Sequence, residues 1–450
     1  MPHSDPVPIA PLLRADGQPM TIGIDGFNLA LDKGTGVATY GRNLSHTLKQ
    51  LGAKVDVLYG TPVRGTDDDL LKEVLFFDGP PPEGNRWLKL ARQARALVSS
   101  SRHQAFEIPV TGAVVTDSFN SRLPRFDRVL NVTQLYQRAQ ARFEFMRTIQ
   151  RVGLDPAPDV MHWTYPLPIR ATGVRNIYTL HDLVPLRLPY TTLDRKPSYF
   201  DLMKWIAKSA DHIVTVSEAS RKDIIDLLGV PPDRVTNTYQ AVHLPRHLME
   251  RDETEVEDEV RGVFHLEPRD YFLFFGSIEP KKNIGRIIEA FLASGVDSPL
   301  VIVGARAWKS KAELRLIESL PGGDRRIVQI EYLPLPMLVS LIRSAKAVVF
   351  PSLYEGFGLP VLEAMMLGTP VLTANTSSLP EVAGDAALKV NPYSVSEIGA
   401  ALRALDKNED LRAMLAQRGR VQAALFDESV YARRLSSLYR SICAAPPRTA

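Results

Sequence analysis

Short apolar segments alternate with amphipathic segments of helical length through nearly all of the 450 residues of the chain. Apolar, β-branched runs that alternate with helices are typical of parallel sheets covered by helices on both faces. Predicted strands in the first half lie at residues 21–25, 55–59, 160–163, 177–180 and 212–216. The pattern begins again in the second half, with predicted strands at 271–275, 300–303, 327–330 and 347–350. The sequence therefore predicts an α/β fold built from two doubly wound units of similar size.

The boundary between the two units is predicted near residue 245. Residues 245–270 contain the charged run ERDETEVEDEVR, which is poor in strand-forming residues and predicts a solvated linker helix. We expect a first domain at 1–245, a second domain at 246–425, and a final helix with a short tail at 426–450.

Residues 83–154 exceed what a simple doubly wound domain needs, and we expect them to form a basic helical insertion. Arginines and aromatic residues are interleaved along this segment. A basic face with aromatic side chains can lie on an anionic membrane or receive a lipid diphosphate. A solvated helical surface whose aromatic side chains point into the core explains the same composition.

Charge and cysteine content narrow the functional classes. A formal net charge of +3 is too close to neutral to indicate a nucleic-acid partner. The single cysteine, Cys443, excludes an internal disulfide and indicates a reducing compartment. The sequence shows neither a signal-peptide pattern nor the roughly 18–20 continuous apolar residues of a membrane-spanning helix. We expect a cytoplasmic protein whose membrane contact, if it makes one, is peripheral, on the inner face of the cytoplasmic membrane.

A glycine-containing loop between a predicted strand and a predicted helix carries the clearest chemical signal. Residues 345–353 predict a buried strand, and residues 360–368 predict a helix that begins at a proline and ends at a glycine. Gly356 and Gly358 lie in the loop, so its backbone N–H groups are not covered by side chains. They lie beside a helix N-terminus, and this combination suits the binding of a diphosphate.

Two glutamates flank this loop and helix start, Glu355 before it and Glu363 about one turn inside the helix. A carboxylate at the second position can accept hydrogen bonds from vicinal sugar hydroxyls, as acidic residues do for ribose in dinucleotide folds. For either glutamate alone, the simpler interpretation is a carboxylate that only offsets the helix dipole.

Three further groups of residues follow predicted strands and are candidates for the same site. Gly34 and Gly36 precede the first helix, where backbone can approach a ligand closely. His181 ends the strand at 177–180, and Lys281 and Lys282 follow the strand at 271–275, where ammonium groups can neutralise a diphosphate. The aspartates at 67–69 follow no predicted strand and are better explained as a solvated turn or helix cap, so we expect no required metal.

The motif EGFGLPVLEAM, followed by GTPV and LPEVAGDAA, is similar to the donor-site signature of the family 4 retaining glycosyltransferases. Two glutamates with seven residues between them are that family's hallmark. The resemblance extends from about residue 22 to residue 439 and is strongest at 272–392. It implies the GT-B fold, in which two facing Rossmann-like domains enclose a deep cleft that holds the active site.

The same resemblance implies roles for individual residues. The catalytic residues that it implies are His181, Glu355 and Lys282. The donor-binding residues that it implies are Gly34, Gly36, Lys281, Lys282, Phe357, Gly358, Leu359 and Glu363. The acceptor-binding residues that it implies are His162, Trp163 and Tyr165. Ser277 stands where many members carry arginine, which leaves open which residue supplies the second positive charge.

The combination HDLVPL, GSIEPKKN and VGARAW resembles the mannosyltransferase-like branch that acts in bacterial polysaccharide or O-antigen assembly. It implies hexose transfer without a cofactor, with GDP-mannose as the favoured donor and UDP-glucose as the alternative. The implied acceptor is a saccharide linked to a polyprenyl diphosphate. The rival interpretations are a sugar-nucleotide epimerase or hydrolase, and a non-catalytic sugar-nucleotide-binding protein on the same architecture.

Overall fold

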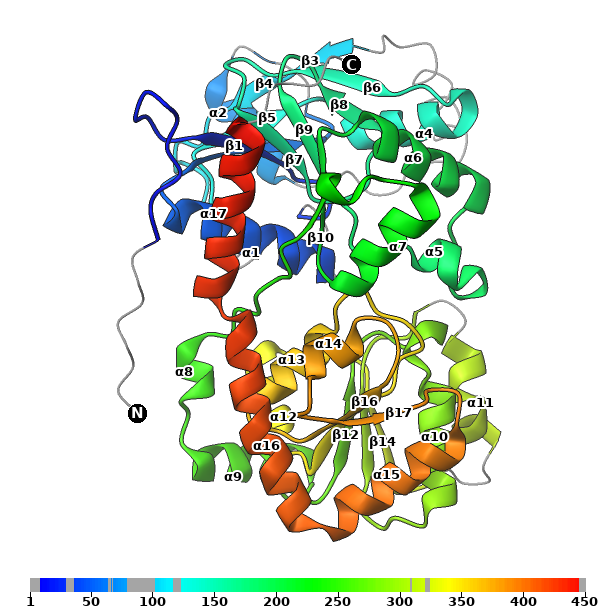
Figure 1. Cartoon of the computed structure of the whole chain (residues 1–450). Helices are drawn as coiled ribbons and strands as arrows, with labels where there is room; N and C mark the ends of the chain where they lie inside the picture. The colour runs from blue at the N-terminus through cyan, green and yellow to red at the C-terminus, as the bar shows by residue number, and fades with distance from the viewer. Residues whose placement is uncertain are drawn as a thin grey trace.

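The computed structural model describes residues 9–29, 36–63, 66, 68–78, 102–115, 123–307, 310–319 and 324–444. Two sheets follow one another along the chain and lie one above the other in Figure 1. The first has eight strands in the order β11-β10-β9-β7-β1-β2-β5-β4, and the second has six in the order β14-β13-β12-β15-β16-β17. We call each of these sheets with its helices the first and the second domain. The predicted α/β fold with two doubly wound units is confirmed.

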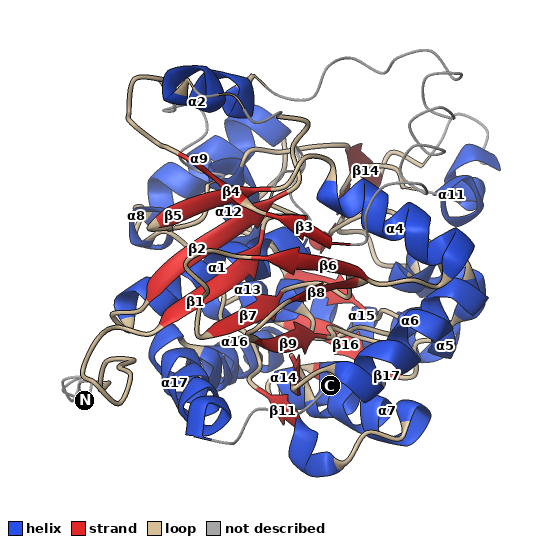
Figure 2. Cartoon of the chain, turned by 90° about the horizontal axis from the view of Figure 1, so that it is seen from above, coloured by secondary structure: helices blue, strands red, loops and turns tan. Residues whose placement is uncertain are grey.

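The first domain is parallel except at its edge, where β4 pairs with β5 antiparallel. Its strands are β1 (Thr21–Asp25), β2 (Lys54–Tyr59), β4 (Phe106–Ile108), β5 (Arg128–Asn131), β7 (Val160–Trp163), β9 (Arg175–Thr179), β10 (His212–Thr215) and β11 (Val235–Asn237). A smaller sheet contains β3 (Arg102–Gln104), β6 (Gln150–Gly153) and β8 (Ile169–Ala171). The helices are α1 (Gly36–Gln50), α2 (Asp69–Phe77), α4 (Leu135–Met146), α5 (Val184–Arg187), α6 (Lys196–Ser209) and α7 (Glu218–Leu228). Figure 2 shows helices on both sides of the strands.

The second domain is parallel throughout the pairings that the structure describes. Its strands are β12 (Phe272–Phe275), β13 (Leu300–Val303), β14 (Ile327–Ile330), β15 (Ala347–Phe350), β16 (Val371–Ala374) and β17 (Leu388–Val390). Every residue of β12, β13, β15 and β16 is buried, as apolar strands covered on both faces require. The helices are α8 (Arg246–Met249), α9 (Glu253–Phe264), α10 (Ile284–Ser294), α11 (Ser310–Ser319), α12 (Leu335–Arg343), α13 (Leu359–Met366), α14 (Leu379–Ala383), α15 (Val395–Lys407) and α16 (Glu409–Ala423).

The last helix of the described chain, α17 (Glu428–Ala444), returns to the first domain. Figure 1 shows it beside α1, directly above α16 of the second domain. Tyr431, Leu435 and Tyr439 of α17 are buried, and Arg440 donates hydrogen bonds to the carbonyls of Ala10 and Pro11. The two domains are therefore joined by the chain at two places. No helix in the described ranges is both long and apolar enough to cross a membrane.

The expectation of a basic helical insertion at 83–154 is wrong for the part of that segment that the structure describes. Four short strands lie there, two of them in the first sheet, together with the single helix α4. Arg128 explains part of the basic composition: its Nη2 lies 2.7 Å from Asp56 Oδ2, and it also bonds two backbone carbonyls. This arginine links β5 to its neighbour β2 instead of contributing to a basic face. Residues 83–101 and 116–122 lie outside the described residues.

Candidate active site

The loop between β15 and α13 needs both of its glycines. Gly358 is the N-cap of α13 with φ of 113°, and a Cβ there would lie 2.8 Å from a methyl group of Leu379. Gly356 faces the first domain so closely that a Cβ would lie 2.7 Å from the carbonyl oxygen of His181. A side chain at either position would strain the backbone or separate the domains. The loop is therefore fitted both to its own helix and to the opposite domain.

Glu355 and Lys282 form an ion pair beside the loop that meets the first domain. The Lys282 Nζ donates to Glu355 Oε1 at 2.7 Å, and the two side chains are only 12% and 8% exposed. Burial raises the pKa of the Glu355 carboxyl. The charges of Lys282 and Lys281 and the hydrogen bond from Lys282 outweigh that effect, so the pKa lies below its ordinary value. Glu355 is thus ionised at neutral pH.

Lys281 lies beside this pair, within reach of carboxylates from both domains. Burial opposes its charge, but Glu355, Asp182 and Glu279 together raise the pKa of the Lys281 ammonium above its ordinary value. Its Nζ is 3.7 Å from Glu279 Oε1. The two lysines follow β12 on the short 3₁₀ turn Pro280–Lys282, so the backbone there delivers both positive charges to one side of the cleft.

Glu363 lies on α13, about one turn after the helix start, and its carboxyl is partly buried. Burial raises the pKa of Glu363 to about 7. Its desolvation is not offset by a neighbouring cation, in contrast to that of Glu355. A buried carboxyl that lacks such an offset is suited to receive hydroxyl groups of a ligand.

The starts of two helices meet across the cleft. Gly36 opens α1 in the first domain and Leu359 opens α13 in the second, and a Cβ at Gly36 would lie 3.6 Å from Leu359 Cδ1. Helix N-termini carry unpaired N–H donors and partial positive charge, so two of them together favour an anion. Gly34 lies outside the described residues.

His181 follows β9 and is held in one orientation. Its Nε2 lies 2.9 Å from the carbonyl oxygen of Thr164, and its ring packs edge-on against Tyr40 with centroids 4.8 Å apart. A carbonyl oxygen only accepts, so Nε2 carries the proton and Nδ1 is left as a hydrogen-bond acceptor. Burial lowers the pKa of the imidazole, which is therefore neutral at physiological pH and can accept a sugar hydroxyl.

Two of the three residues expected to bind the acceptor are in the core. His162 is fully buried, with Nδ1 2.6 Å from Tyr439 Oη and Nε2 2.7 Å from Thr179 Oγ1. Trp163 is also fully buried, and its Nε1 donates to Asn176 Oδ1 at 3.0 Å. Both assignments are wrong, because these side chains have no surface left for a ligand and their polar atoms are already bonded.

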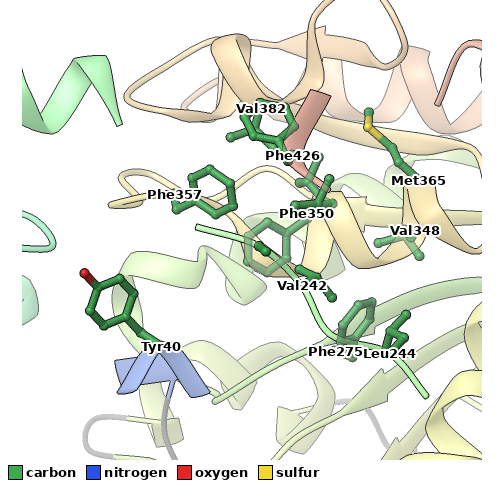
Figure 3. Close-up of a cluster of buried hydrophobic side chains, with 14 of the residues drawn as sticks. Tyr40, Val242, Leu244, Phe275, Val348, Phe350, Phe357, Met365, Val382 and Phe426 are labelled. Atoms are coloured by element: carbon green, nitrogen blue, oxygen red, sulfur yellow. The ribbon is translucent and has the colours of Figure 1, made fainter. Parts of the chain in front are cut away.

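Phe357 requires a partial correction. Its side chain is 3% exposed and packs against Phe426, with ring centroids 5.6 Å apart, and against Tyr239 at 6.3 Å. Figure 3 shows Phe357 beside Phe426 and Val382, with Tyr40 of α1 on the opposite side. The ring belongs to the core at the domain junction, so only the backbone of Phe357 is available to a donor.

Tyr165, the third expected acceptor residue, lines a pocket of about 310 Å³ between the domains. His181 and Lys281 line the same pocket. Other residues of this pocket, among them Asp182, Asp194, Tyr199 and Glu279, were not predicted from the sequence. Asp182 and Glu279 have a recognisable signal, since each lies directly beside a motif that follows a strand. Asp194 and Tyr199 carry no such signal.

Asp25 is a further residue that sequence reasoning missed. It ends β1, is fully buried, and its carboxylate accepts hydrogen bonds from the backbone N–H groups of Thr164 and Phe27. Burial raises the pKa of Asp25 to about 6, although those hydrogen bonds oppose the shift. Through Thr164, Asp25 orders the loop that carries Tyr165 and that bonds His181. An acidic residue at the end of an otherwise apolar strand was the available signal.

A smaller pocket of about 200 Å³ lies where β13 and β14 end. Arg306 and Glu331 line it together with the backbone segment at Gly304. The carboxyl ends of parallel strands are where open α/β sheets bind nucleotides. Across the described ranges, no three His, Cys, Asp or Glu side chains are grouped as a metal site would require.

Two family models match the chain. The model "Glycosyl transferases group 1" matches residues 256–422, and the model "Glycosyltransferase Family 4" matches residues 110–246. The two matches fall on the second and the first domain respectively, and together they include more than half of the chain.

Curated relatives include two proteins of Escherichia coli. O-antigen chain mannosyltransferase B is 34% identical over 262 residues, which are 56% of this chain and 66% of that protein. The serotype-specific mannosyltransferase WbdA is 28% identical over 289 residues, which are 60% of this chain and 35% of that protein. The chain thus spans just under two thirds of the first relative and about a third of the second.

Solved structures agree on the architecture. Sucrose-phosphate synthase from Thermosynechococcus elongatus matches with a TM-score of 0.63 at 17% identity, over 95% of this chain and all of that one. Anabaena HepE, in complex with UDP and glucose, matches with a TM-score of 0.61 at 14% identity, over 94% of this chain and all of that one. At these identities the likeness concerns the fold. The two matched models and the two facing domains show that the chain belongs to the family 4 glycosyltransferases and has the GT-B fold.

Proposed function

We propose that this protein is a retaining hexosyltransferase that moves mannose from GDP-mannose to a saccharide acceptor in cell-surface polysaccharide assembly. The names of the relatives support mannose, because one is an O-antigen chain mannosyltransferase and the other a serotype-specific mannosyltransferase. The observation that carries the proposal is the buried Lys282–Glu355 pair, which lies beside the start of α13 and opposite the start of α1.

The donor diphosphate would bind where positive potential converges. Lys281, Lys282 and the N–H groups at Gly358 and Leu359 supply donors from the second domain, and the N-terminus of α1 at Gly36 supplies them from the first. Glu363 would accept hydrogen bonds from the ribose hydroxyls. This arrangement neutralises a diphosphate leaving group without a metal ion.

The pocket where β13 and β14 end would hold the nucleobase. Guanine presents N–H donors at its Watson–Crick edge and an acceptor at O6. Glu331 can accept from those donors and Arg306 can donate to the oxygen, and both residues line the pocket. Uracil presents a single N–H donor and would leave the carboxylate less well satisfied. The lining therefore supports GDP over UDP.

Retention of configuration is proposed to follow from same-face attack. Glu355 is ionised but paired with Lys282, so it is a poor candidate for a free nucleophile. The acceptor hydroxyl would attack from the side on which the diphosphate leaves, through an ion-pair-like transition state. The departing phosphate oxygen would take the hydroxyl proton, while neutral His181 accepts a hydroxyl of the transferred sugar. Domain closure would exclude water.

A lipid-linked acceptor and contact with the inner face of the cytoplasmic membrane belong to the same proposal. Exposed apolar side chains lie next in sequence to the residues of the acceptor side. Leu193 is 73% exposed, Phe145 63% and Met146 53%. Glu144, next to Phe145, forms an ion pair with Arg195, two residues after Leu193, so the two segments that carry these side chains lie near each other. Exposed apolar side chains suit the lipid end of an acceptor.

The test is donor binding followed by transfer. Thermal-shift titration without metal should show stabilisation by GDP-mannose that exceeds that by UDP-glucose or UDP-GlcNAc. Glu363→Ala should weaken donor binding, whereas Glu355→Ala should lower turnover more than binding. Release of free sugar or an epimer without an acceptor would support the hydrolase or epimerase alternative, and binding without any turnover would support the non-catalytic one.

A further inference from the structure

Two pockets join into one groove that leads from the cleft over the first domain. The inner pocket of about 310 Å³ lies between His181 and Lys281. The outer pocket of about 270 Å³ extends over α4 and α6. Four residues line both pockets, namely Tyr165, Pro166, Asp194 and Tyr199. Because these residues form a common wall, the pockets are neighbouring compartments of one acceptor groove.

The walls of the acceptor groove combine aromatic rings with carboxylates. Tyr165 and Tyr199 form the shared wall, and Phe143 lines the outer pocket. Asp182 and Glu279 line the inner pocket, Glu144 lines the outer one, and Asp194 lines both. Aromatic faces pack against the C–H faces of sugar rings, and carboxylates accept hydrogen bonds from hydroxyls. This is a lining for saccharide, with polar groups that can fix its orientation.

The positive charges of the groove are already engaged. In the arrangement proposed above Lys281 serves the donor diphosphate, with Glu355, Asp182 and Glu279 holding its charge, and Arg195 is ion-paired with Glu144 in the outer pocket. Burial and the negative charges of Asp194 and Asp182 raise the pKa of Tyr165 to about 12, which agrees with a negative potential at the shared wall. A phosphate group placed inside the groove would meet carboxylates without a free cation on the groove's described lining.

We infer that the acceptor groove binds a neutral saccharide of at least two sugar units, with the accepting sugar in the inner pocket and the preceding sugar in the outer one. This inference rests on the glycosyltransferase function proposed above. Each pocket is close to the lower end of the roughly 300–1,000 Å³ of small-molecule sites, which leaves room for one sugar ring. The protein therefore extends an existing saccharide, and the diphosphate of a lipid-linked acceptor lies beyond the outer pocket.

The first experiment compares neutral acceptors of increasing length. Methyl glycosides of mono-, di- and trisaccharides built from mannose, glucose and galactose are each incubated with GDP-mannose, and kcat/KM is measured. We expect a gain of about tenfold from the monosaccharide to the disaccharide with the same terminal sugar. A phosphate on the second sugar should remove most of that gain. Equal use of mono- and disaccharides, or better use of the phosphorylated disaccharide, would overturn the inference.

A substitution in the outer pocket separates groove binding from catalysis. Ser198 lines only the outer pocket, so Ser198→Trp should fill it and lower kcat/KM about tenfold for disaccharides. The monosaccharide reaction and the KM for the donor should stay unchanged. Lys208→Trp, on the exposed side of the same helix, is the matched control. An equal loss for mono- and disaccharides would contradict the inference. Absence of transfer from any sugar nucleotide to any acceptor would instead contradict the proposed function itself.

Discussion

The Lys282 Nζ lies 2.7 Å from Glu355 Oε1, although 73 residues separate the two positions in the sequence. Adjacent strands explain the contact: the loops that follow β12 and β15 carry Lys282 and Glu355, and these two strands pair in parallel. The topology of the second sheet therefore brings a cation and an anion to one edge. The pair is almost completely shielded from water, so each buried charge is stabilised by the other.

Removing only one partner of this pair should destabilise the protein. Lys282→Met leaves the Glu355 carboxylate buried with only the more distant Lys281 to offset it, at a cost on the order of 3 kcal/mol. The double variant Lys282→Met/Glu355→Gln removes both charges and should recover most of that loss. Urea denaturation at pH 7.5 measures both values.

Activity should behave differently from stability in the same series. Both the single and the double variant lose the cation that would face the diphosphate, so kcat should stay at least about a hundredfold below wild type in each. A double variant that recovers turnover together with stability would show that the pair is only structural.

Donor binding should strengthen as pH rises through the pKa of Glu363. Burial raises this pKa to about 7 in the free protein, so the carboxyl is largely protonated below that value. Ribose hydroxyls donate to the ionised form, so the apparent Kd for GDP-mannose should rise up to about tenfold per pH unit below 7. Calorimetry between pH 5.5 and 8 measures it. Glu363→Gln should bind more weakly at pH 8 and show a flatter profile than wild type, because it lacks the carboxyl whose pKa is about 7.

The geometry of the candidate donor side could be predicted from the sequence because its parts are local. Apolar β-branched runs predict the strands, and glycines placed directly after a strand predict the loop from Glu355 to Gly358. The charges and helix starts then follow from neighbouring positions in the chain. Strands β4 and β17, with three residues each, are too short to give a recognisable pattern.

The acceptor side depends on contacts that local patterns do not contain. His162 lies one residue before the end of β7 and was expected in the cleft, but α17 returns to the first domain, and Tyr439, 277 residues later, bonds the ring. The wall formed by Asp194 and Tyr199 arises because the loop before α6 folds back towards Tyr165. Tertiary packing decides which strand ends remain accessible to a ligand, and the spacing of residues in this sequence does not indicate that packing.

The choice of nucleobase should depend on Glu331. In the proposed arrangement its carboxylate accepts N–H donors of guanine, and Glu331→Gln keeps the size of the side chain while it removes the charge. We expect the Kd for GDP to rise about fivefold to tenfold and the Kd for UDP to change less than twofold. Fluorescence or calorimetric titration with the free nucleotides checks this. Glu397→Gln, which changes a carboxylate of the same domain outside this pocket lining, is the control.

Glu381 joins the two domains, and its loss should favour their separation. This second-domain carboxylate accepts the backbone N–H groups of Glu218 and Ala219 at 2.9 and 3.0 Å, at the start of α7 in the first domain. It also accepts the hydroxyl of Tyr239 at 3.2 Å. A carboxylate at a helix N-terminus is favoured by both the free N–H groups and the helix dipole. The contact thus stabilises the closed arrangement in which Gly356 meets His181.

We therefore expect Glu381→Ala to populate open forms before any ligand is bound. Its radius of gyration in solution scattering should exceed that of wild type, and saturating GDP-mannose should reduce the difference. Part of the free energy of donor binding is then used to close the domains. The KM for the donor should therefore rise about tenfold, while kcat falls less. Glu397→Ala, which removes a carboxylate from the same domain away from the junction, should match wild type in both measurements. Unchanged scattering in Glu381→Ala would mean that the remaining junction, including the Tyr239, Phe357 and Phe426 rings, holds the domains together without this carboxylate.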